Sequence, residues 1–255
     1  MKYLLLLVAL SFSAKAQDLE LFQKLEFNAS NGLNLPYRLL LPEKLEAGKK
    51  YPVILLLHGA GERGSDNEKQ LVHGAKLFAT EENRKNFPAI VIAPQCPAEG
   101  YWASVLVDRA TNPFGLSFDY SRPITQPLEA AIELVKKILK EQPADKSRVY
   151  ITGLSMGGMG TFEAIYRFPK LFAAAAPICG GGDTKLYSRQ AAKVPFWIFH
   201  GDADAVIDVK ESRAMVEKLK SLQAKVKYTE YGGVNHNSWD NAFAEPDFLK
   251  WLLEN

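Results

Sequence analysis

Apolar runs and helical stretches alternate along the chain from residue 21 to the C-terminus. Runs rich in Val, Ile, Phe and Tyr are each followed by a segment with helical spacing of its apolar residues. This alternation predicts a mostly parallel sheet with helices on both faces. Several runs are apolar at every position, which is typical of strands buried on both sides. The eight predicted strands are 21–29, 33–41, 53–57, 89–93, 149–152, 173–178, 196–199 and 226–231.

The first two strands flank Asn31-Gly32, a dipeptide that tolerates positive φ and predicts an antiparallel hairpin. Ser65 and Glu68 have the spacing of a capping box, and so do Asp208 and Glu211. The predicted helices are 67–80, 127–140, 156–167, 209–222 and 247–253.

Two segments depart from this alternation. Residues 100–126 are rich in aromatic residues, Gly and Pro and lack helical spacing, so we expect a long loop, and such loops are often functional. Residues 180–194 are too few to form a large cap domain. We therefore expect the functional site to be fairly open.

The first residues have the pattern of a secretory signal peptide. Lys2 is followed by an apolar run and then by Ala14-Lys15-Ala16, a cleavage pattern before Gln17. The run is far shorter than the roughly 20 residues that a membrane-spanning helix needs. We expect a leader at 1–16, a single folded domain at 17–255, no membrane span, and a secreted or periplasmic protein.

Charge gives no reason to expect a nucleic acid partner. Residues 1–16 contain two lysines and no acid, so their removal leaves 29 basic and 29 acidic residues. A nearly neutral chain with scattered Lys and Arg lacks the basic footprint of proteins that bind nucleic acids or anionic membranes. The oligomeric state is not specified by the sequence.

A serine stands between two glycines where a predicted strand meets a predicted helix. Gly153-Leu154-Ser155-Met156-Gly157 matches G-x-S-x-G, and this context favours a nucleophile on a sharp turn over an incidental serine in a glycine-rich turn. The turn would expose the Ser155 hydroxyl at a helix N-terminus, where negative charge is stabilised.

A serine nucleophile requires a base and an orienting acid. Of the four histidines, His236 follows the last strand on a loop, where this architecture places its base. The acid is expected between Ser155 and His236, where Asp202, Asp204 and Asp208 are candidates. Asp208 is better explained as a helix cap and Asp202 as a loop brace, so we favour Asp204.

The backbone amide of Met156 would be one donor to the oxyanion, and the loop after the third strand would supply the other, for which we favour Ala60. No cofactor or metal is expected. The histidines fall singly on separate segments, without the spacing of a zinc site, and no phosphate-binding or dinucleotide-binding motif is present.

The chain resembles the α/β-hydrolase superfamily, and within it the secreted esterases grouped with polyhydroxybutyrate depolymerases, feruloyl esterases and "predicted peptidases" related to prolyl oligopeptidases. The resemblance rests on HGAGERG, IAPQCP with Trp102 after it, GLSMGG, APICGGGD, FHGDAD and YGGVNHNSW. It implies a triad of Ser155, Asp204 and His236 and oxyanion donors at Ala60 and Met156. Asn235 stands where these relatives often have glycine.

The resemblance also bears on the two cysteines, Cys96 and Cys179. In the family's strand order they follow strands three positions apart, which at about 4.8 Å per strand is some 14 Å. A disulfide needs Cα atoms within about 7 Å. We therefore expect two free or buried thiols.

These residues predict hydrolysis of small carboxylic esters, with acyl or feruloyl esters on plant polysaccharide suggested by the family analogy alone. Trp102 and Trp239 are the favoured substrate contacts; the alternative is that the aromatic residues of 100–126 anchor that loop to the core. Two other functions stay open: a serine peptidase related to prolyl oligopeptidase, and a non-catalytic carbohydrate-binding protein with the same fold.

Overall fold

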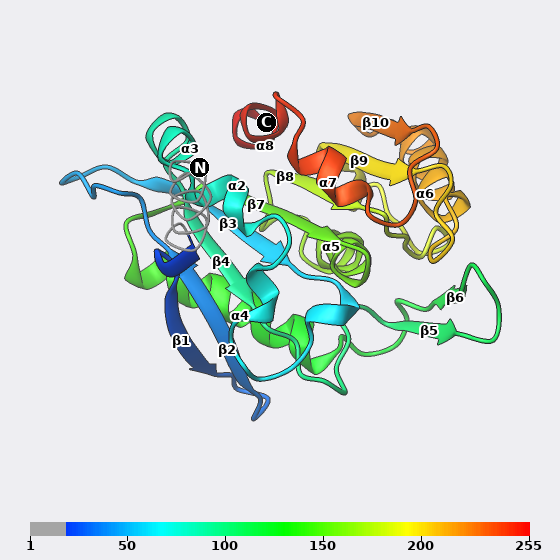
Figure 1. The fold of residues 1–255 in the computed structure, drawn as a ribbon, viewed down its shortest axis with the longest axis horizontal. Coiled ribbons are helices and arrows are strands. Elements are labelled where there is room, and N and C mark those ends of the chain that lie inside the picture. The colour runs from blue at the N-terminus through cyan, green and yellow to red at the C-terminus, as the bar shows by residue number, and fades with distance from the viewer. Residues whose placement is uncertain (1–18) are drawn as a thin grey trace, which may run out of the picture.

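The computed structural model describes residues 19–255, so the expected leader at 1–16 lies outside the described residues. One sheet of eight strands runs through this part of the chain, in the order β1-β2-β4-β3-β7-β8-β9-β10 (Figure 1). The strands are β1 (Gln23–Asn28), β2 (Asn34–Leu40), β3 (Tyr51–Leu57), β4 (Ile90–Pro94), β7 (Ala144–Leu154), β8 (Ala174–Ile178), β9 (Phe196–Gly201) and β10 (Val226–Tyr231). The predicted eight-stranded sheet is confirmed.

Strand direction follows the predicted pattern. β1 and β2 form an antiparallel hairpin, and β2 pairs antiparallel with β4. The remaining neighbours, from β4 to β10, are parallel. The carboxyl ends of these parallel strands therefore meet at one edge of the sheet, where ligand sites of open α/β sheets are built.

The alternation of side chains along each buried strand divides the core between the two faces of the sheet. In β3, Val53, Leu55 and Leu57 pack on one face, together with helices α4, α5 and α6. Ile54 and Leu56 pack on the other, together with α2, α7 and α8. The helices are α2 (Ala75–Ala79), α3 (Glu81–Asn86), α4 (Gln126–Glu141), α5 (Met156–Arg167), α6 (Lys210–Ser221), α7 (Ser238–Phe243) and α8 (Phe248–Glu254).

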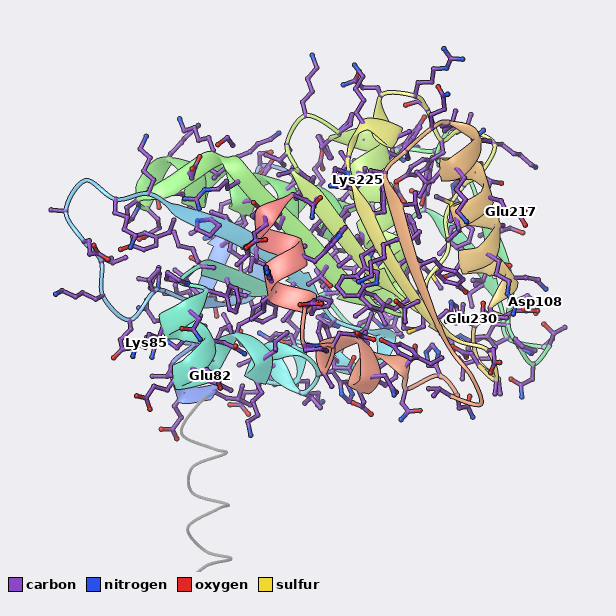
Figure 2. The ribbon with its side chains drawn as sticks, turned by 90° about the horizontal axis from the view of Figure 1, so that it is seen from above. Glu82, Lys85, Asp108, Glu217, Lys225 and Glu230 are labelled. Atoms are coloured by element: carbon purple, nitrogen blue, oxygen red, sulfur yellow. The ribbon has the colours of Figure 1, made fainter. Side chains whose placement is uncertain are left out.

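The last strand, β10, lies at the edge of the sheet and carries charged side chains such as Glu230, which pairs with Arg213 of α6 (Figure 2). Charges on an edge strand discourage pairing with another chain. No helix within residues 19–255 is long and apolar enough to cross a membrane.

The predicted helix at 67–80 is wrong. The segment forms a 3₁₀ turn at Lys69–Leu71 and then the short helix α2, separated by Gly74 with φ 78°. Asp66, not Ser65, caps the turn, because its Oδ1 accepts from the amides of Glu68 and Lys69 at 2.8 and 2.9 Å. Hydrogen bonds from Asn67 to Leu25 of β1 and to Gln95 after β4 hold this broken segment in place, and local helix signals do not predict such contacts.

The helix α3, a strand pair and the helix α7 were not predicted. Within residues 100–126 a small antiparallel hairpin forms from β5 (Val105–Asp108) and β6 (Gly115–Phe118), and it projects from the body of the molecule (Figure 1). The loop after β10 contains the short helix α7. The cysteines are free and buried, as expected, because β3 and β7 separate the strands that they follow.

Candidate active site

Ser155 occupies a sharp turn between β7 and α5. Its backbone has φ 52° and ψ −115°, a strained conformation for a residue with a side chain. The turn is compact because helix and strand nearly touch. A Cβ on Gly153 would lie 2.5 Å from the Gly157 carbonyl oxygen, and one on Gly157 would lie 2.6 Å from the Leu57 carbonyl carbon. Both glycines are therefore required by close backbone approach.

Three segments far apart in the sequence meet at this turn. His236 Nε2 lies 3.0 Å from Ser155 Oγ, and His236 Nδ1 lies 2.8 Å from Asp204 Oδ2. The structure thus brings together the three residues favoured from the sequence, in a continuous hydrogen-bonded chain. In this arrangement the Nδ1–H donates to Asp204, which leaves Nε2 to accept from the serine hydroxyl.

The side chain of Asp204 is buried, and both of its carboxylate oxygens have hydrogen-bond donors. Its Oδ1 accepts from the amides of Val206 and Ile207, at 2.8 and 2.9 Å. Its Oδ2 faces both His236 and His200 Nε2, the latter at 3.2 Å. Burial alone would raise the pKa of Asp204, but the hydrogen bonds from His200 and His236 outweigh it and hold this pKa well below its ordinary value.

His200 is a further histidine that bonds to Asp204 in the site. It is buried at the end of β9, with Nδ1 2.7 Å from Ser212 Oγ and Nε2 3.0 Å from the Ile207 carbonyl oxygen. Because Nε2 faces only acceptors, it must carry a proton. His200 therefore fixes the carboxylate that orients His236.

The loops that carry the acid and the base are tied to each other. Asn235 Oδ1 accepts from the amides of Ala205 and His236, at 2.9 and 2.7 Å. Asp202 Oδ1 accepts from the Gly233 amide at 2.6 Å, which is the bracing role expected for Asp202. The asparagine in place of the family's glycine thus links the two loops, a contact that the sequence did not predict.

Of the two expected oxyanion donors, Met156 directly follows Ser155, and Ala60 lines the same cavity as Ser155. Met156 is the first residue of α5, and Ala60 begins a 3₁₀ turn after β3. The first amides of a helix have no intrahelical acceptor and face a negative charge favourably. His58 braces the Ala60 loop: burial lowers its pKa to about 4, so the neutral ring donates from Nδ1 to the Gly59 carbonyl and accepts at Nε2 from the Cys96 amide.

Ser155 and His236 open into a cavity of about 270 Å³. Trp239 lines it, as expected, with its ring 5.2 Å from that of His236. Trp102 does not line it, and this expectation is wrong: its side chain is buried beneath the loop, against Gly160 and 5.4 Å from the His58 ring. The other aromatic residues divide likewise, since Tyr101 and Phe114 line the cavity and Tyr120 is buried in the core.

One group of residues within 19–255 has atoms close enough to share a metal ion. One atom each of Cys179, Asp204 and His236 lies within 4.8 Å of the others. Asp204 and His236 already bond to each other, and burial raises the pKa of the Cys179 thiol, which disfavours the thiolate that binds metals. The triad hydrogen bonds account for this cluster without a metal.

The family model for phospholipases and carboxylesterases matches residues 44–250. A solved thermostable esterase is 38% identical, with a TM-score of 0.84, over 93% of this chain and 64% of that chain. Carboxylesterase SOBER1 of Arabidopsis thaliana is 25% identical over 72% of this chain and 82% of its own length.

A shorter match is to the bifunctional acetylxylan esterase/xylanase XynS20E of Neocallimastix patriciarum, 31% identical over 88 residues. This match covers 34% of this chain and 13% of that protein. The chain therefore spans less than two thirds of the length of XynS20E, and the same holds for the thermostable esterase. The match over residues 44–250, together with the eight-stranded sheet, shows the relationship. The chain belongs to the phospholipase/carboxylesterase family of the α/β-hydrolase superfamily.

Proposed function

We propose that this protein is a secreted serine esterase that hydrolyses small carboxylic esters through Ser155, His236 and Asp204. One observation carries the proposal: the unbroken hydrogen-bonded chain from the Ser155 hydroxyl through His236 to a buried, ionised Asp204, opening into a cavity. The family match and the esterase relatives agree with this activity.

The geometry supports acyl transfer in two steps. Ser155 Oγ attacks the ester carbonyl while His236 Nε2 takes its proton, and Asp204 stabilises the imidazolium that forms. The amides of Ala60 and Met156 would receive the developing oxyanion. His236 then protonates the leaving alcohol and activates the water that releases the acid from Ser155.

The size of the cavity favours a small acyl group. About 270 Å³ lies at or below the lower end of the roughly 300–1,000 Å³ typical of ligand sites. Aromatic faces of Tyr101, Phe114 and Trp239 line it and suit an acyl or a phenolic group. Together with the acetylxylan esterase relative, this supports acetyl or feruloyl esters on plant polysaccharide as substrates. The leader pattern at 1–16 supports secretion or a periplasmic location.

The test is hydrolysis by purified residues 17–255 of p-nitrophenyl acetate, butyrate and octanoate beside methyl ferulate. Ser155→Ala is the control: folding should survive because the side chain is small, while turnover should fall by roughly three to six orders of magnitude. Turnover that persists in this variant would remove Ser155 from the mechanism. Faster hydrolysis of matched amides than of esters would instead favour a peptidase.

A further inference from the structure

The catalytic cavity cannot hold the whole of a large substrate. Its volume of about 270 Å³ accommodates an ester group and a small acyl chain, with Ser155 and His236 on its wall. If the alcohol part is large, it must extend beyond this cavity and find its contacts elsewhere. The residues around the mouth of this cavity then determine which alcohols bind well.

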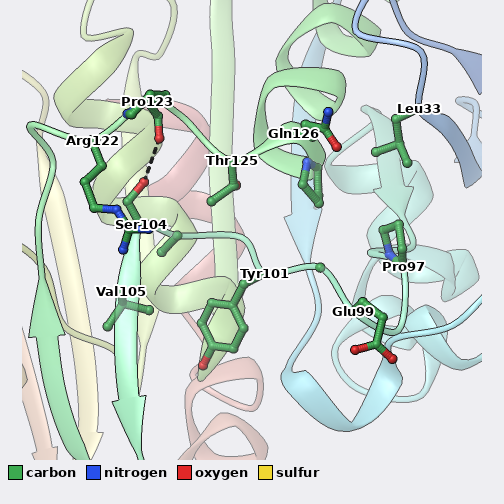
Figure 3. Close-up of a pocket in the computed structure, with 13 residues that line it drawn as sticks. Leu33, Pro97, Glu99, Tyr101, Ser104, Val105, Arg122, Pro123, Thr125 and Gln126 are labelled. Atoms are coloured by element: carbon green, nitrogen blue, oxygen red, sulfur yellow. Dashed lines mark hydrogen bonds between the residues drawn. The ribbon is translucent and has the colours of Figure 1, made fainter.

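A second and larger cavity has a volume of about 620 Å³, and Figure 3 shows the side chains that line it. It is formed by residues 97–105, by residues 122–127 before and at the start of α4, and by Leu33 from the turn between β1 and β2. Tyr101 lines both cavities, which places them next to each other. This volume lies within the roughly 300–1,000 Å³ range of ligand sites.

Three polar side chains of this second cavity lack partners among the described residues, whereas Ser104 Oγ, which also lines it, donates to the Pro123 carbonyl and bonds to Glu163. Glu99 and Arg122 are exposed, carry opposite charges and form no ion pair or side-chain hydrogen bond within residues 19–255. Thr125 Oγ1 is buried and has no hydrogen-bond partner in the same part of the chain. A buried hydroxyl without a partner is costly, which favours a ligand that supplies one.

Most of the remaining wall is apolar and includes Val105, Tyr101 and three prolines, with Ser104 and Gln126 as further polar residues. One positive and one negative side chain leave the cavity without net charge, so it offers no advantage to an anion or a cation. A ligand that fits must present both donors and acceptors beside apolar faces. A sugar ring does this, because each hydroxyl both donates and accepts and the C–H faces pack on aromatic and proline rings.

We propose that the second cavity binds the carbohydrate that carries the ester, with Glu99, Arg122 and Thr125 as its polar contacts and Tyr101 dividing the carbohydrate from the acyl group. This inference rests on the proposed esterase function and adds a site for the alcohol part of the substrate. None of the three polar residues touches the triad.

The experiment compares two substrates in two variants. Glu99→Ala combined with Arg122→Ala removes both charges at exposed positions, and Val105→Trp fills the cavity by volume. The control pair, Glu82→Ala with Lys85→Ala, removes two opposite charges on α3 that line neither cavity (Figure 2). Each protein is assayed on p-nitrophenyl acetate and on acetylated xylo-oligosaccharides.

We expect kcat/KM for the acetylated oligosaccharides to fall about tenfold or more in both cavity variants, since hydrogen bonds to charged groups contribute at least this much to affinity. Hydrolysis of p-nitrophenyl acetate should stay within about twofold of the wild-type value, because its alcohol is small, and the control pair should change neither substrate. Equal loss on both substrates, or no loss on the oligosaccharides, would overturn the inference while leaving the esterase function intact.

A binding measurement separates the inference from turnover altogether. Calorimetric titration of unesterified xylohexaose into Ser155→Ala protein should show saturable binding, weakened about tenfold when Glu99 and Arg122 are also replaced. Absence of binding, or equal binding with and without the two charged residues, would overturn the proposal. Failure of the wild type to hydrolyse p-nitrophenyl acetate would count against the proposed function alone.

Discussion

Replacing Gly157 with alanine tests the packing that holds Ser155 in place. The added Cβ would overlap the Leu57 carbonyl oxygen and lie 2.6 Å from the carbonyl carbon of Leu57 and 2.8 Å from the carbonyl oxygen of His58. These are backbone atoms of β3 and of the loop after it, so they cannot yield as the end of a flexible side chain can. Helix α5 and β3 must therefore move apart.

The magnitude follows from this contact. Overpacking costs about 1–3 kcal/mol, and rigid neighbours place Gly157→Ala near the upper end of this range. For a chain of this size each kcal/mol lowers Tm by about 2–4 °C, so we expect a Tm about 6–12 °C below that of the wild type. Activity should fall by more than stability implies, because a displacement of about 1 Å at a catalytic group can cost roughly 100-fold in rate.

The assay is thermal unfolding followed by circular dichroism, together with kcat/KM on p-nitrophenyl acetate at a temperature where all proteins are folded. Gly232→Ala is the matched control, since a Cβ there would meet only Asp202 at 4.0 Å and the position has no positive φ. We expect its Tm within about 2 °C of the wild-type value. A Gly157→Ala protein with wild-type Tm and activity would refute the argument from close approach.

Three further predictions concern the surroundings of the triad. The pKa of Asp204 is lower in the folded chain than its ordinary value of 3.8. The ionised carboxylate therefore stabilises the fold above pH 3.8, and this stabilisation is lost as the pH falls from 3.8 towards the pKa of Asp204 in the folded chain. Urea unfolding at pH 5 and pH 3 should thus show a smaller loss of stability for Asp204→Asn than for the wild type; equal losses would contradict the assignment. His200→Leu removes a hydrogen-bond donor to Asp204, so it should lower the free energy of unfolding by about 1.5–3 kcal/mol and reduce kcat. His200→Gln keeps a donor and should recover part of the lost stability and part of the lost kcat. Equal stability and kcat in the Leu and Gln variants would argue against the hydrogen bond. Thiol titration of the denatured chain should give two thiols with or without reductant, whereas thiols that appear only after reduction would mean a disulfide.

Much of the fold and the site could be predicted because the signals are local. Buried strands such as β3 are apolar throughout, and α5 and β10 have the predicted bounds because their own residues specify helix and strand. The glycines on both sides of Ser155 predict the sharp turn, because only glycine fits where α5 approaches β3. The order of serine, acid and base along the chain narrowed the search for the partners of Ser155.

Other features depend on contacts between distant residues. The expected helix at 67–80 is broken because Asn67 donates to the Leu25 carbonyl and to Gln95 Oε1, and these tertiary hydrogen bonds outweigh local helix propensity. Trp102 is adjacent in sequence to Tyr101, yet one ring is buried and the other lines the cavity, because only packing decides which way each side chain of an irregular loop points.

The sequence by itself determined the alternating strands and helices, the sharp turn at Ser155 and a short set of candidate acids and bases. The tertiary structure shows that Asp204, which the sequence favoured over Asp202 and Asp208, meets His236, and it alone decided that His200 and Asn235 bond to the two loops. The physical reason is that periodicity and glycine requirements act between near neighbours, whereas a hydrogen bond between residues 32 or 81 positions apart exists only after the sheet brings their loops to one edge.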